Sequence, residues 1–180
     1  MKRLIILRHA KSSWDDPVQR DFDRPLNAKG RRAAEAMGRY MRDRGVSFDR
    51  AVASPAARVV ETLEAAGRGY GAPIAPQWDS RAYLAPARTL LEILHETPGE
   101  AESLLLSGHN SGLEDLVLLL VPESDDDAKR ASVEEKFPTC SLAVIEFDAA
   151  NWSDLEAGQG VLSDFTRPRD LDSELGPDRE

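Results

Sequence analysis

Short apolar runs alternate along the chain with stretches in which apolar residues recur every three or four positions. The runs at 4–7, 51–53 and 104–106 have the continuous apolar character of strands buried on both faces of a parallel sheet. The stretches between them predict amphipathic helices that cover this sheet. A repeat of strand, loop and helix is typical of an α/β protein, so we expect a three-layer α/β/α sandwich with a mainly parallel sheet.

Residues that cap helices indicate where the predicted helices begin and end. Asn27 suits the N-cap of a helix over 27–44. Ser54 suits the N-cap of a second helix to about residue 66, and the glycines and proline over 67–73 predict a loop after it. Two further helices are predicted, one over 88–96 and one that runs from a capping box at Ser111–Glu114 to about Leu120.

The last third of the chain has strand-like runs without a predicted helix between them. The runs over 142–147 and 160–165 predict strands that pair antiparallel at an edge of the sheet. The acidic run over 123–127 is typical of a solvated loop. Prolines, glycines and charges over 167–180 predict a mobile tail, so we expect a single catalytic domain over 1–166.

The charge and the cysteine content narrow the classes of partner. The 180 residues carry a formal net charge of −9 with a pI near 4.9, which argues against nucleic-acid and anionic-membrane binding, since both need a basic face. The single cysteine, Cys140, excludes an intrachain disulfide, and the first apolar run is too short for a signal-peptide core. We therefore expect a cytoplasmic protein, and the lack of an obvious apolar surface stripe favours a monomer.

Residues that suit phosphoryl chemistry follow each of the three strand-like runs. Arg8 and His9 follow the first, Arg58 lies just after the second, and His109 follows the third. Open α/β sheets bind ligands at the carboxyl ends of their strands, so we expect these side chains to meet. Arginine neutralises phosphoryl oxygens, and a neutral imidazole is a competent nucleophile near neutral pH. The pattern predicts a phosphoryl-transfer pocket with His9 as the nucleophile.

Other polar side chains near these strand ends have two open interpretations. Ser12 could bind the phosphate, although a solvated loop serine is the commoner case. Arg24 either lines the pocket or pairs with a nearby aspartate, and Asn110 is a candidate substrate contact. A metal between His9 and His109 is disfavoured, because two arginines in the same pocket would repel a divalent cation. We therefore expect no metal and no other cofactor.

Four motifs, in this order, resemble those of the histidine phosphatase superfamily. They are Arg8-His9, Asp23-Arg24-Pro25-Leu26-Asn27-x-x-Gly30, Ser54-Pro55-x-x-Arg58-x-x-x-Thr62 and Ser107-Gly108-His109-Asn110. The resemblance spans about residues 2–147 and is greatest to the small phosphohistidine phosphatases of the SixA type. It implies a phosphoglycerate mutase-like fold and a phosphorylated His9 that water then hydrolyses, with the phosphate held by Arg8, Arg58 and His109.

Two features depart from the pattern of that superfamily. Many members have glycine after the Arg-His pair, where this chain has Ala10, and alanine disfavours a positive φ. Larger members use a carboxylate from the segment after the second arginine as proton donor, and here that segment offers Asp79 and Glu92 outside a recognisable motif. The first loop offers other candidates: Asp15, Asp16, Asp21 and Asp23. A phosphohistidine substrate needs such an acid less, because imidazole is a better leaving group than an alkoxide.

Three functional hypotheses remain open from the sequence. We favour a metal-independent phosphatase that acts on phosphohistidine in a protein, for instance a signalling protein, because the loops are short and leave the pocket open. The first alternative is a small-molecule phosphomonoesterase of the same superfamily. The second is a phosphate-binding or phosphoprotein-binding module without turnover, which His9 disfavours because binding alone needs no in-line imidazole.

Overall fold

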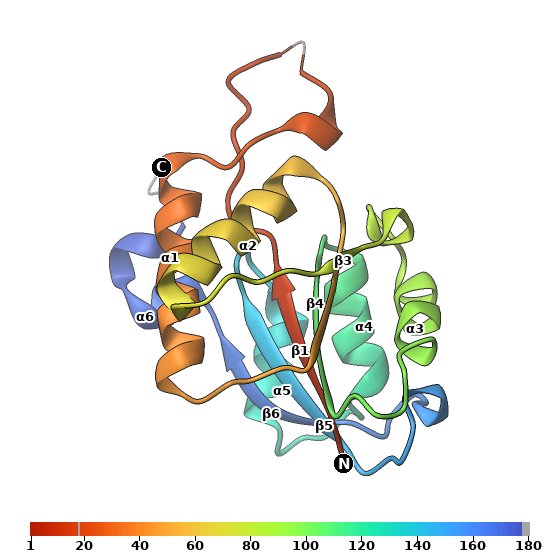
Figure 1. Cartoon of the computed structure of the whole chain (residues 1–180). Helices are drawn as coiled ribbons and strands as arrows, with labels where there is room; N and C mark the ends of the chain where they lie inside the picture. The colour runs from red at the N-terminus through yellow and green to blue at the C-terminus, as the bar shows by residue number, and fades with distance from the viewer. Residues whose placement is uncertain (18, 178–180) are drawn as a thin grey trace.

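The computed structural model describes residues 1–17 and 19–177, and a six-stranded sheet forms its centre (Figure 1). The strands are β1 Lys2–Arg8, β2 Arg50–Ala53, β3 Gln77–Trp78, β4 Ser103–Gly108, β5 Leu142–Phe147 and β6 Val161–Thr166. Their order across the sheet is β3-β2-β4-β1-β5-β6. The strands β3, β2, β4 and β1 are mutually parallel. The strand β5 pairs antiparallel with β1 and with β6. The sheet is therefore mainly parallel, with an antiparallel edge as the sequence predicted.

Helices cover both faces of this sheet. They are α1 Ala28–Asp43, α2 Ala57–Tyr70, α3 Ala87–His95, α4 Gly112–Leu120, α5 Ala128–Glu135 and α6 Pro168–Leu171. Alternate residues of β1 point to opposite faces, so that Ile5 and Leu7 join the core under α1 and α2. Leu4 and Ile6 join the core under α3, α4 and α5. Burial on both faces explains the continuous apolar runs, and the predicted three-layer α/β/α sandwich is confirmed.

The helices α1 and α2 pack together through glycine. A Cβ atom at Gly69 would lie 1.9 Å from the carbonyl oxygen of Glu35 in α1, so only glycine permits this approach. The helix α2 continues through Gly67 and Gly69, so the loop predicted from residue 67 begins only at residue 71. The helix ends instead at Gly71, whose φ of 86° is left-handed. Gly69 thus serves helix packing, Gly67 faces the segment that follows the helix, and only Gly71 ends the helix.

Replacing Gly69 with alanine should lower the free energy of unfolding by about 1–3 kcal/mol, because the added methyl group would push α1 away from α2. The higher helix propensity of alanine acts in the opposite direction and contributes about 1 kcal/mol at most. Urea unfolding measures the difference. Gly67→Ala is the matched control in the same helix, because its Cβ would lie 3.1 Å from the nearest carbonyl oxygen and should cost less. An equal loss in both variants would contradict the close-contact explanation.

The starts of α1 and α2 test the capping predictions. Asn27 caps α1 as predicted, with its side chain accepting a hydrogen bond from the Gly30 amide at 2.7 Å. Ser54 does not cap α2, which begins at Ala57. The Ser54 hydroxyl lies instead 2.8 Å from Nε2 of His109. A residue type that suits a helix cap is used here by the predicted catalytic site.

The carboxyl-terminal third contains more helix than the sequence predicted. The acidic loop over 123–127 leads into α5, which Asp127 caps by accepting from the Arg130 amide at 3.0 Å. The mobile tail predicted for 167–180 is folded up to residue 177: α6 and a 3-10 helix at Ser173–Leu175 pack against α1. Their leucines, Leu171 and Leu175, contact the core under α1, which accounts for the difference. The remainder of that prediction, for 178–180, lies outside the described residues.

Candidate active site

The register of the sheet brings two of the predicted catalytic residues together. Neighbouring strands β1 and β4 pair with Arg8 opposite Gly108, so the next residue of each strand, His9 and His109, emerges at the same end. The centroids of the two imidazole rings are 5.3 Å apart. The His9 amide donates to the Gly108 carbonyl oxygen at 3.1 Å, which ties the two strand ends to each other. The two histidines are therefore held by the sheet itself.

The hydrogen bonding of the His9 ring distinguishes its two nitrogens. Its Nδ1 lies 2.7 Å from the carbonyl oxygen of Ala10, which can only accept, so Nδ1 carries the proton and donates it. Nε2 consequently keeps its lone pair. Burial, assisted by the nearby Arg8 guanidinium, lowers the pKa of His9 to about 3. His9 is therefore a neutral imidazole at neutral pH, as a nucleophile must be.

His109 has one nitrogen engaged and one without a partner. Nε2 lies 2.8 Å from the Ser54 hydroxyl oxygen, and Nδ1 is buried with no hydrogen-bond partner among the described residues. A Ser54 hydroxyl that donates to Nε2 leaves the proton of the neutral ring on Nδ1, where it can donate to a phosphoryl oxygen. Burial and the nearby Arg58 guanidinium lower the pKa of His109 to about 4. A buried donor without a partner, such as this Nδ1, is typical of a site that binds an anion.

The two buried imidazoles predict a loss of stability in mild acid. Each has a lowered pKa in the folded state, so the unfolded chain binds more protons between about pH 6.5 and about pH 4. The free energy of unfolding should fall by about 1–2 kcal/mol per histidine between about pH 7 and about pH 5. Urea unfolding at several pH values measures this slope, and His9→Gln should reduce it by about half. Equal slopes in both proteins would contradict a neutral buried His9.

Arg8 is held by a backbone carbonyl that it shares with Asn110. Arg8 Nη1 and Asn110 Nδ2 each donate to the Phe137 carbonyl oxygen at 2.9 Å. Arg8 Nε is buried with no partner in the described part of the chain, which leaves it for a phosphoryl oxygen. The Asn110 side chain also accepts from the Glu114 amide at 3.2 Å, so it caps α4 where Ser111 was predicted to do so. Asn110 thus binds the carbonyl group that holds Arg8, and its side-chain amide is engaged inside the protein.

Arg58 lies in the first turn of α2 and is almost fully buried. Asp21 fixes its guanidinium, since Nη1 donates to the Asp21 carbonyl oxygen at 2.8 Å and Nη2 donates to Oδ2 at 3.0 Å. The Tyr83 hydroxyl donates to the same carboxylate oxygen, and the Tyr83 ring meets the His109 ring edge-on. The sequence offered Asp21 only as one of several acids and missed Tyr83, because no motif marks the segment that follows β3.

Asp21 is a candidate proton donor that reaches Arg58, one of the predicted catalytic residues, but it is held in the ionised form. Partial burial raises the pKa of its carboxyl group, whereas hydrogen bonds from Tyr83, Arg24 and Arg58 outweigh that effect and hold the pKa at about 2. A carboxylate with so low a pKa carries no proton at neutral pH. Asp21 therefore orients Arg58 and does not serve as a general acid.

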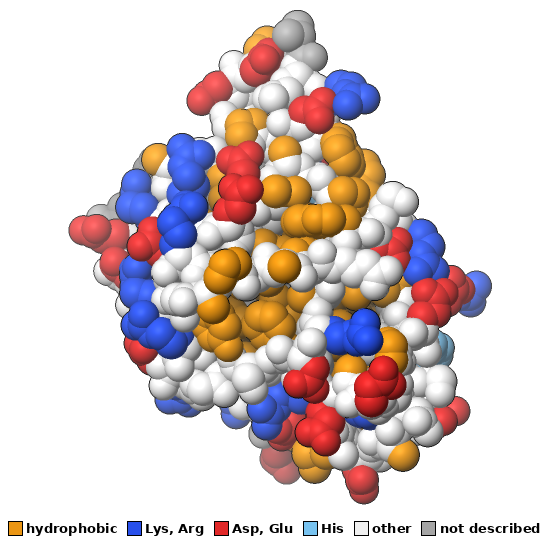
Figure 2. Space-filling model, in the orientation of Figure 1, with side chains coloured by type: hydrophobic (Ala, Val, Ile, Leu, Met, Phe, Trp, Pro, Cys, Tyr) orange, Lys and Arg blue, Asp and Glu red, His pale blue; other side chains and the backbone are white. Residues whose placement is uncertain are grey.

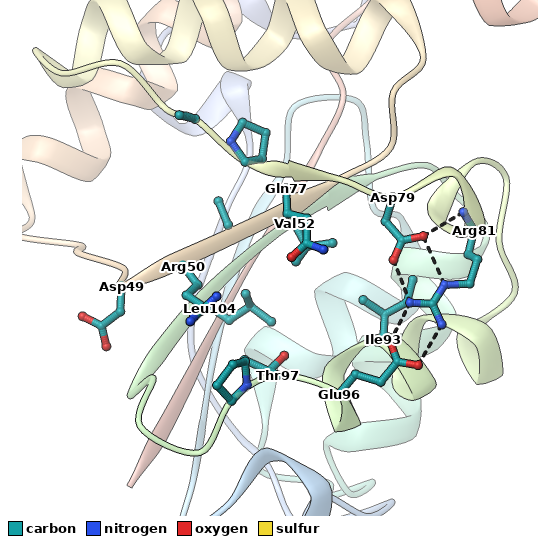
Figure 3. A pocket seen from close by; sticks show the side chains of 14 residues that line it. Asp49, Arg50, Val52, Gln77, Asp79, Arg81, Ile93, Glu96, Thr97 and Leu104 are labelled. Carbon is teal, nitrogen blue, oxygen red and sulfur yellow. Dashed lines mark hydrogen bonds and ion pairs between the residues drawn. The ribbon is translucent and has the colours of Figure 1, made fainter.

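The other candidates from the segment after Arg58 lie elsewhere. Asp79 lines a cavity of about 490 Å³ that contains none of the four predicted catalytic residues (Figure 3). In it, Arg81 lies between Asp79 and Glu96, with nitrogen-to-oxygen distances of 2.8 and 2.6 Å. The hydrogen bonds from Arg81 lower the pKa of Asp79. Glu92 is on the exposed side of α3. Asp79 is thus bound in an ion-pair network.

Ser12 and Arg24, the other predicted substrate contacts, brace the first loop. Arg24 donates from Nε to the Ser13 carbonyl oxygen at 3.1 Å, from Nη1 to Asp21 at 2.9 Å, and from Nη2 to the Ser12 hydroxyl. Its guanidinium also lies over the ring of the exposed Trp14. Of the two interpretations of Arg24, pairing with an aspartate is the one that the structure contains. Arg24 acts on the site through Asp21.

Ala10, the departure from the family pattern, fits its place without strain. Among the described residues, the non-glycine positions with a positive φ are Leu84 and Cys140. The Ala10 amide donates to the Thr62 hydroxyl oxygen at 2.8 Å, and this hydroxyl donates to the Arg58 carbonyl oxygen at 2.6 Å. The threonine of the third motif therefore joins the loop that follows His9 to α2.

The chemistry of the site suits an anion. Two permanently charged guanidinium groups, of Arg8 and Arg58, accompany the two neutral imidazoles. Over residues 1–17 and 19–177, no group of three histidine, cysteine, aspartate or glutamate side chains is arranged to bind a metal ion. None of the helices in these ranges combines the length and the apolar character needed to cross a bilayer.

Sequence comparison identifies relatives along most of the chain. Residues 4–81 match the family model of the histidine phosphatase superfamily (branch 1). An uncharacterized protein of Mycobacterium tuberculosis is 35% identical over 164 residues, which cover 91% of this chain and 100% of that protein. An uncharacterized chloroplastic protein of Arabidopsis thaliana is 31% identical, over 88% of this chain and 72% of that protein.

Solved structures share the fold. The protein of Agrobacterium tumefaciens assigned as the phosphohistidine phosphatase SixA is 31% identical and superposes with a TM-score of 0.77, over 93% of this chain and 98% of that one. The assigned SixA of Nakamurella multipartita is 25% identical with a TM-score of 0.81, over 93% and 96% of the two chains. The similarity covers nearly the whole fold, which is the phosphoglycerate mutase-like fold.

Proposed function

This chain belongs to the histidine phosphatase superfamily, and we propose that it is a phosphatase that removes the phosphoryl group from phosphohistidine in a protein, with His9 as the nucleophile. The observation that carries the proposal is the state of the His9 ring, whose protonated Nδ1 is bound to a carbonyl oxygen and whose Nε2 is left to attack. Arg8, Arg58 and His109 surround that ring with donors for phosphoryl oxygens.

In the first step, the phosphoryl group is held by the two guanidinium groups and by Nδ1 of His109. Nε2 of His9 forms a bond to phosphorus as the bond from phosphorus to the substrate nitrogen breaks in line with it. The electron pair of the broken bond stays on the substrate ring, which leaves as a neutral imidazole when its other nitrogen is protonated. The Ala10 carbonyl oxygen, accepting from Nδ1, stabilises the positive charge that develops on the His9 ring.

In the second step, water hydrolyses the phosphorylated His9. The water oxygen forms a bond to phosphorus, the bond from phosphorus to Nε2 breaks, and its electron pair returns to Nε2. One proton of the water stays on the inorganic phosphate and the other passes to solvent or to a phosphate oxygen. The arginines again neutralise the equatorial oxygens, so they act in both steps.

The preference for a phosphoramidate rests on the state of Asp21. An alkoxide leaving group needs a proton in the transition state, and the carboxylate at Arg58 is held ionised with a pKa of about 2. Imidazole leaves without that assistance. An enzyme with this arrangement should therefore act faster on phosphohistidine than on an unactivated ester.

The preference for a protein substrate rests on the exposed apolar side chains beside the site. Trp14 is 75% exposed and lies against Arg24, which binds Asp21. Leu84 is 54% exposed and follows Tyr83 in the chain. Exposed aromatic and aliphatic side chains around a charged pocket are typical of a surface that receives another protein.

The test is the ratio of kcat/KM for a phosphohistidine-bearing protein to that for p-nitrophenyl phosphate and for a panel of phosphorylated metabolites, with a chelator present. We expect the phosphoprotein to exceed the best metabolite by at least about tenfold. A metabolite that matches or exceeds it would replace the proposal with a small-molecule phosphatase. Phosphate binding without turnover of any substrate would indicate a binding module.

A further inference from the structure

A basic groove opens beside the catalytic site and shares one residue with it. The groove encloses about 340 Å³ and its lining includes Arg8, whose Nε is the unpartnered donor of the catalytic site. Six of the lining side chains are cationic and none is acidic; the cationic ones are Arg8, Lys11, Lys29, Lys136, Arg167 and Arg169. In a chain with a net charge of −9, such a one-sided lining is unexpected on composition alone.

The groove is built by the folded carboxyl-terminal segment. Gly176 closes one side by accepting a hydrogen bond from Lys29 Nζ at the start of α1. Arg167 is oriented by Asp170, with nitrogen-to-oxygen distances of 3.0 Å. On the face drawn in Figure 2, lysine and arginine side chains gather on the side of the molecule where α1 lies, with acidic side chains among them. Folding of this segment onto α1 therefore assembles cations that the sequence scatters over about 160 residues.

Two of the groove cations are well placed to meet a ligand. Lys136 and Arg169 are exposed, and within the described ranges neither forms an ion pair. Lys136 precedes Phe137, whose carbonyl oxygen holds Arg8, so the groove begins one residue from the arginine clamp. Negative charge bound here would lie next to the phosphoryl group, outside the ring of catalytic side chains.

We propose that this groove binds acidic side chains that flank the phosphohistidine of the protein substrate, an inference that rests on the proposed function. Its cations come from separate segments, which suits several single charges better than one compact phosphate. Apolar residues lie among them, namely Ala33, Pro138, Pro168, Leu175 and Pro177, and can contact the aliphatic stems of glutamate and aspartate. The groove thus selects phosphohistidine sites in acidic sequence.

The experiment compares two synthetic phosphohistidine peptides, one with glutamates on both sides of the phosphohistidine and one with serines there. Wild-type enzyme should show about tenfold higher kcat/KM on the acidic peptide at low salt, mainly through KM. Lys136→Ser combined with Arg169→Ser should lose this preference. The matched control, Arg68→Ser with Arg88→Ser, makes the same change in net charge at exposed residues outside the groove lining and should keep it. Raising the salt to about 1 M should also remove it, without any substitution.

Each result has one meaning. The groove proposal would be overturned if wild-type enzyme turned over the two peptides equally, or if the groove variant kept the preference. Either result would leave the proposed function unaffected. If the control variant loses the preference equally, the preference arises from the overall charge of the protein, and this would also overturn the groove proposal. Turnover of p-nitrophenyl phosphate with neither peptide consumed would overturn the proposed function, and the groove proposal with it.

Discussion

Replacing His9 with alanine should lower kcat by about 10⁴–10⁶-fold on every substrate, the largest effect expected of any single substitution in this protein. The variant loses the one atom, Nε2, that forms the bond to phosphorus. Arg8, Arg58 and His109 remain to bind the phosphoryl group, so KM should change far less than kcat. The substitution removes an interaction that exists only along the reaction path.

Trapping the covalent intermediate measures the same step directly. Wild-type enzyme that is incubated with ³²P-labelled substrate and quenched without acid should carry label that is stable in alkali and lost in acid. His9→Ala should carry none. His95→Ala is the matched control, because the His95 ring binds the Leu155 carbonyl oxygen at 2.8 Å and has no part in the mechanism. Equal activity of His9→Ala and wild type would refute the mechanism.

Replacing Arg58 with lysine should lower kcat/KM by about 10²–10³-fold although the positive charge is kept. Arg58 presents a planar guanidinium that is already fixed by two hydrogen bonds that it donates to Asp21 oxygens, at 2.8 and 3.0 Å. A lysine ammonium group is a single point of charge on a flexible stem and cannot reproduce two parallel bonds to a phosphoryl group. The loss should appear in kcat and KM together, because the arginine binds both the substrate and the transition state.

The control for this prediction lies in the same helix. Arg68→Lys changes the same residue type on the exposed side of α2 and should leave kcat/KM within about twofold of wild type. Inhibition by inorganic phosphate supplies a second reading, since Arg58→Lys should weaken it as well. A lysine variant with wild-type kcat/KM would mean that only net charge matters at this position and would contradict the geometric role of Asp21.

Much of the catalytic centre could be predicted because its residues follow strands. The carboxyl ends of parallel strands meet at one edge of a sheet, so apolar runs that stop at Arg8 and at Ser107 predict that His9 and His109 lie at the same edge. The observed register pairs Arg8 with Gly108. Arg58 could be placed by the same argument, since it lies in the first turn of the helix that follows β2. The hydrophobic pattern and the position along the chain are sufficient to predict where such residues lie.

Contacts between segments distant in the sequence could not be predicted in this way. Asp21 comes from the first loop and Tyr83 from the segment after β3, and they meet at Arg58 without a local pattern in either segment. Gly69 looked like a helix breaker because the sequence does not display the α1 backbone against which it packs. The type of a residue limits the roles that it can have, and the residues around it in the folded protein determine which of these roles it has.

The sequence by itself therefore determined the layered α/β fold, the positions of the buried strands and the residues that follow their carboxyl ends, because these depend on local hydrophobic period and strand direction. Only the tertiary structure decided the protonated nitrogen of His9, the ionised Asp21 at Arg58 and the basic groove beside Arg8. Each of these depends on burial and on the charges of segments that are brought together by folding. Electrostatic properties follow the surroundings of a group, and those surroundings exist only once the chain is folded.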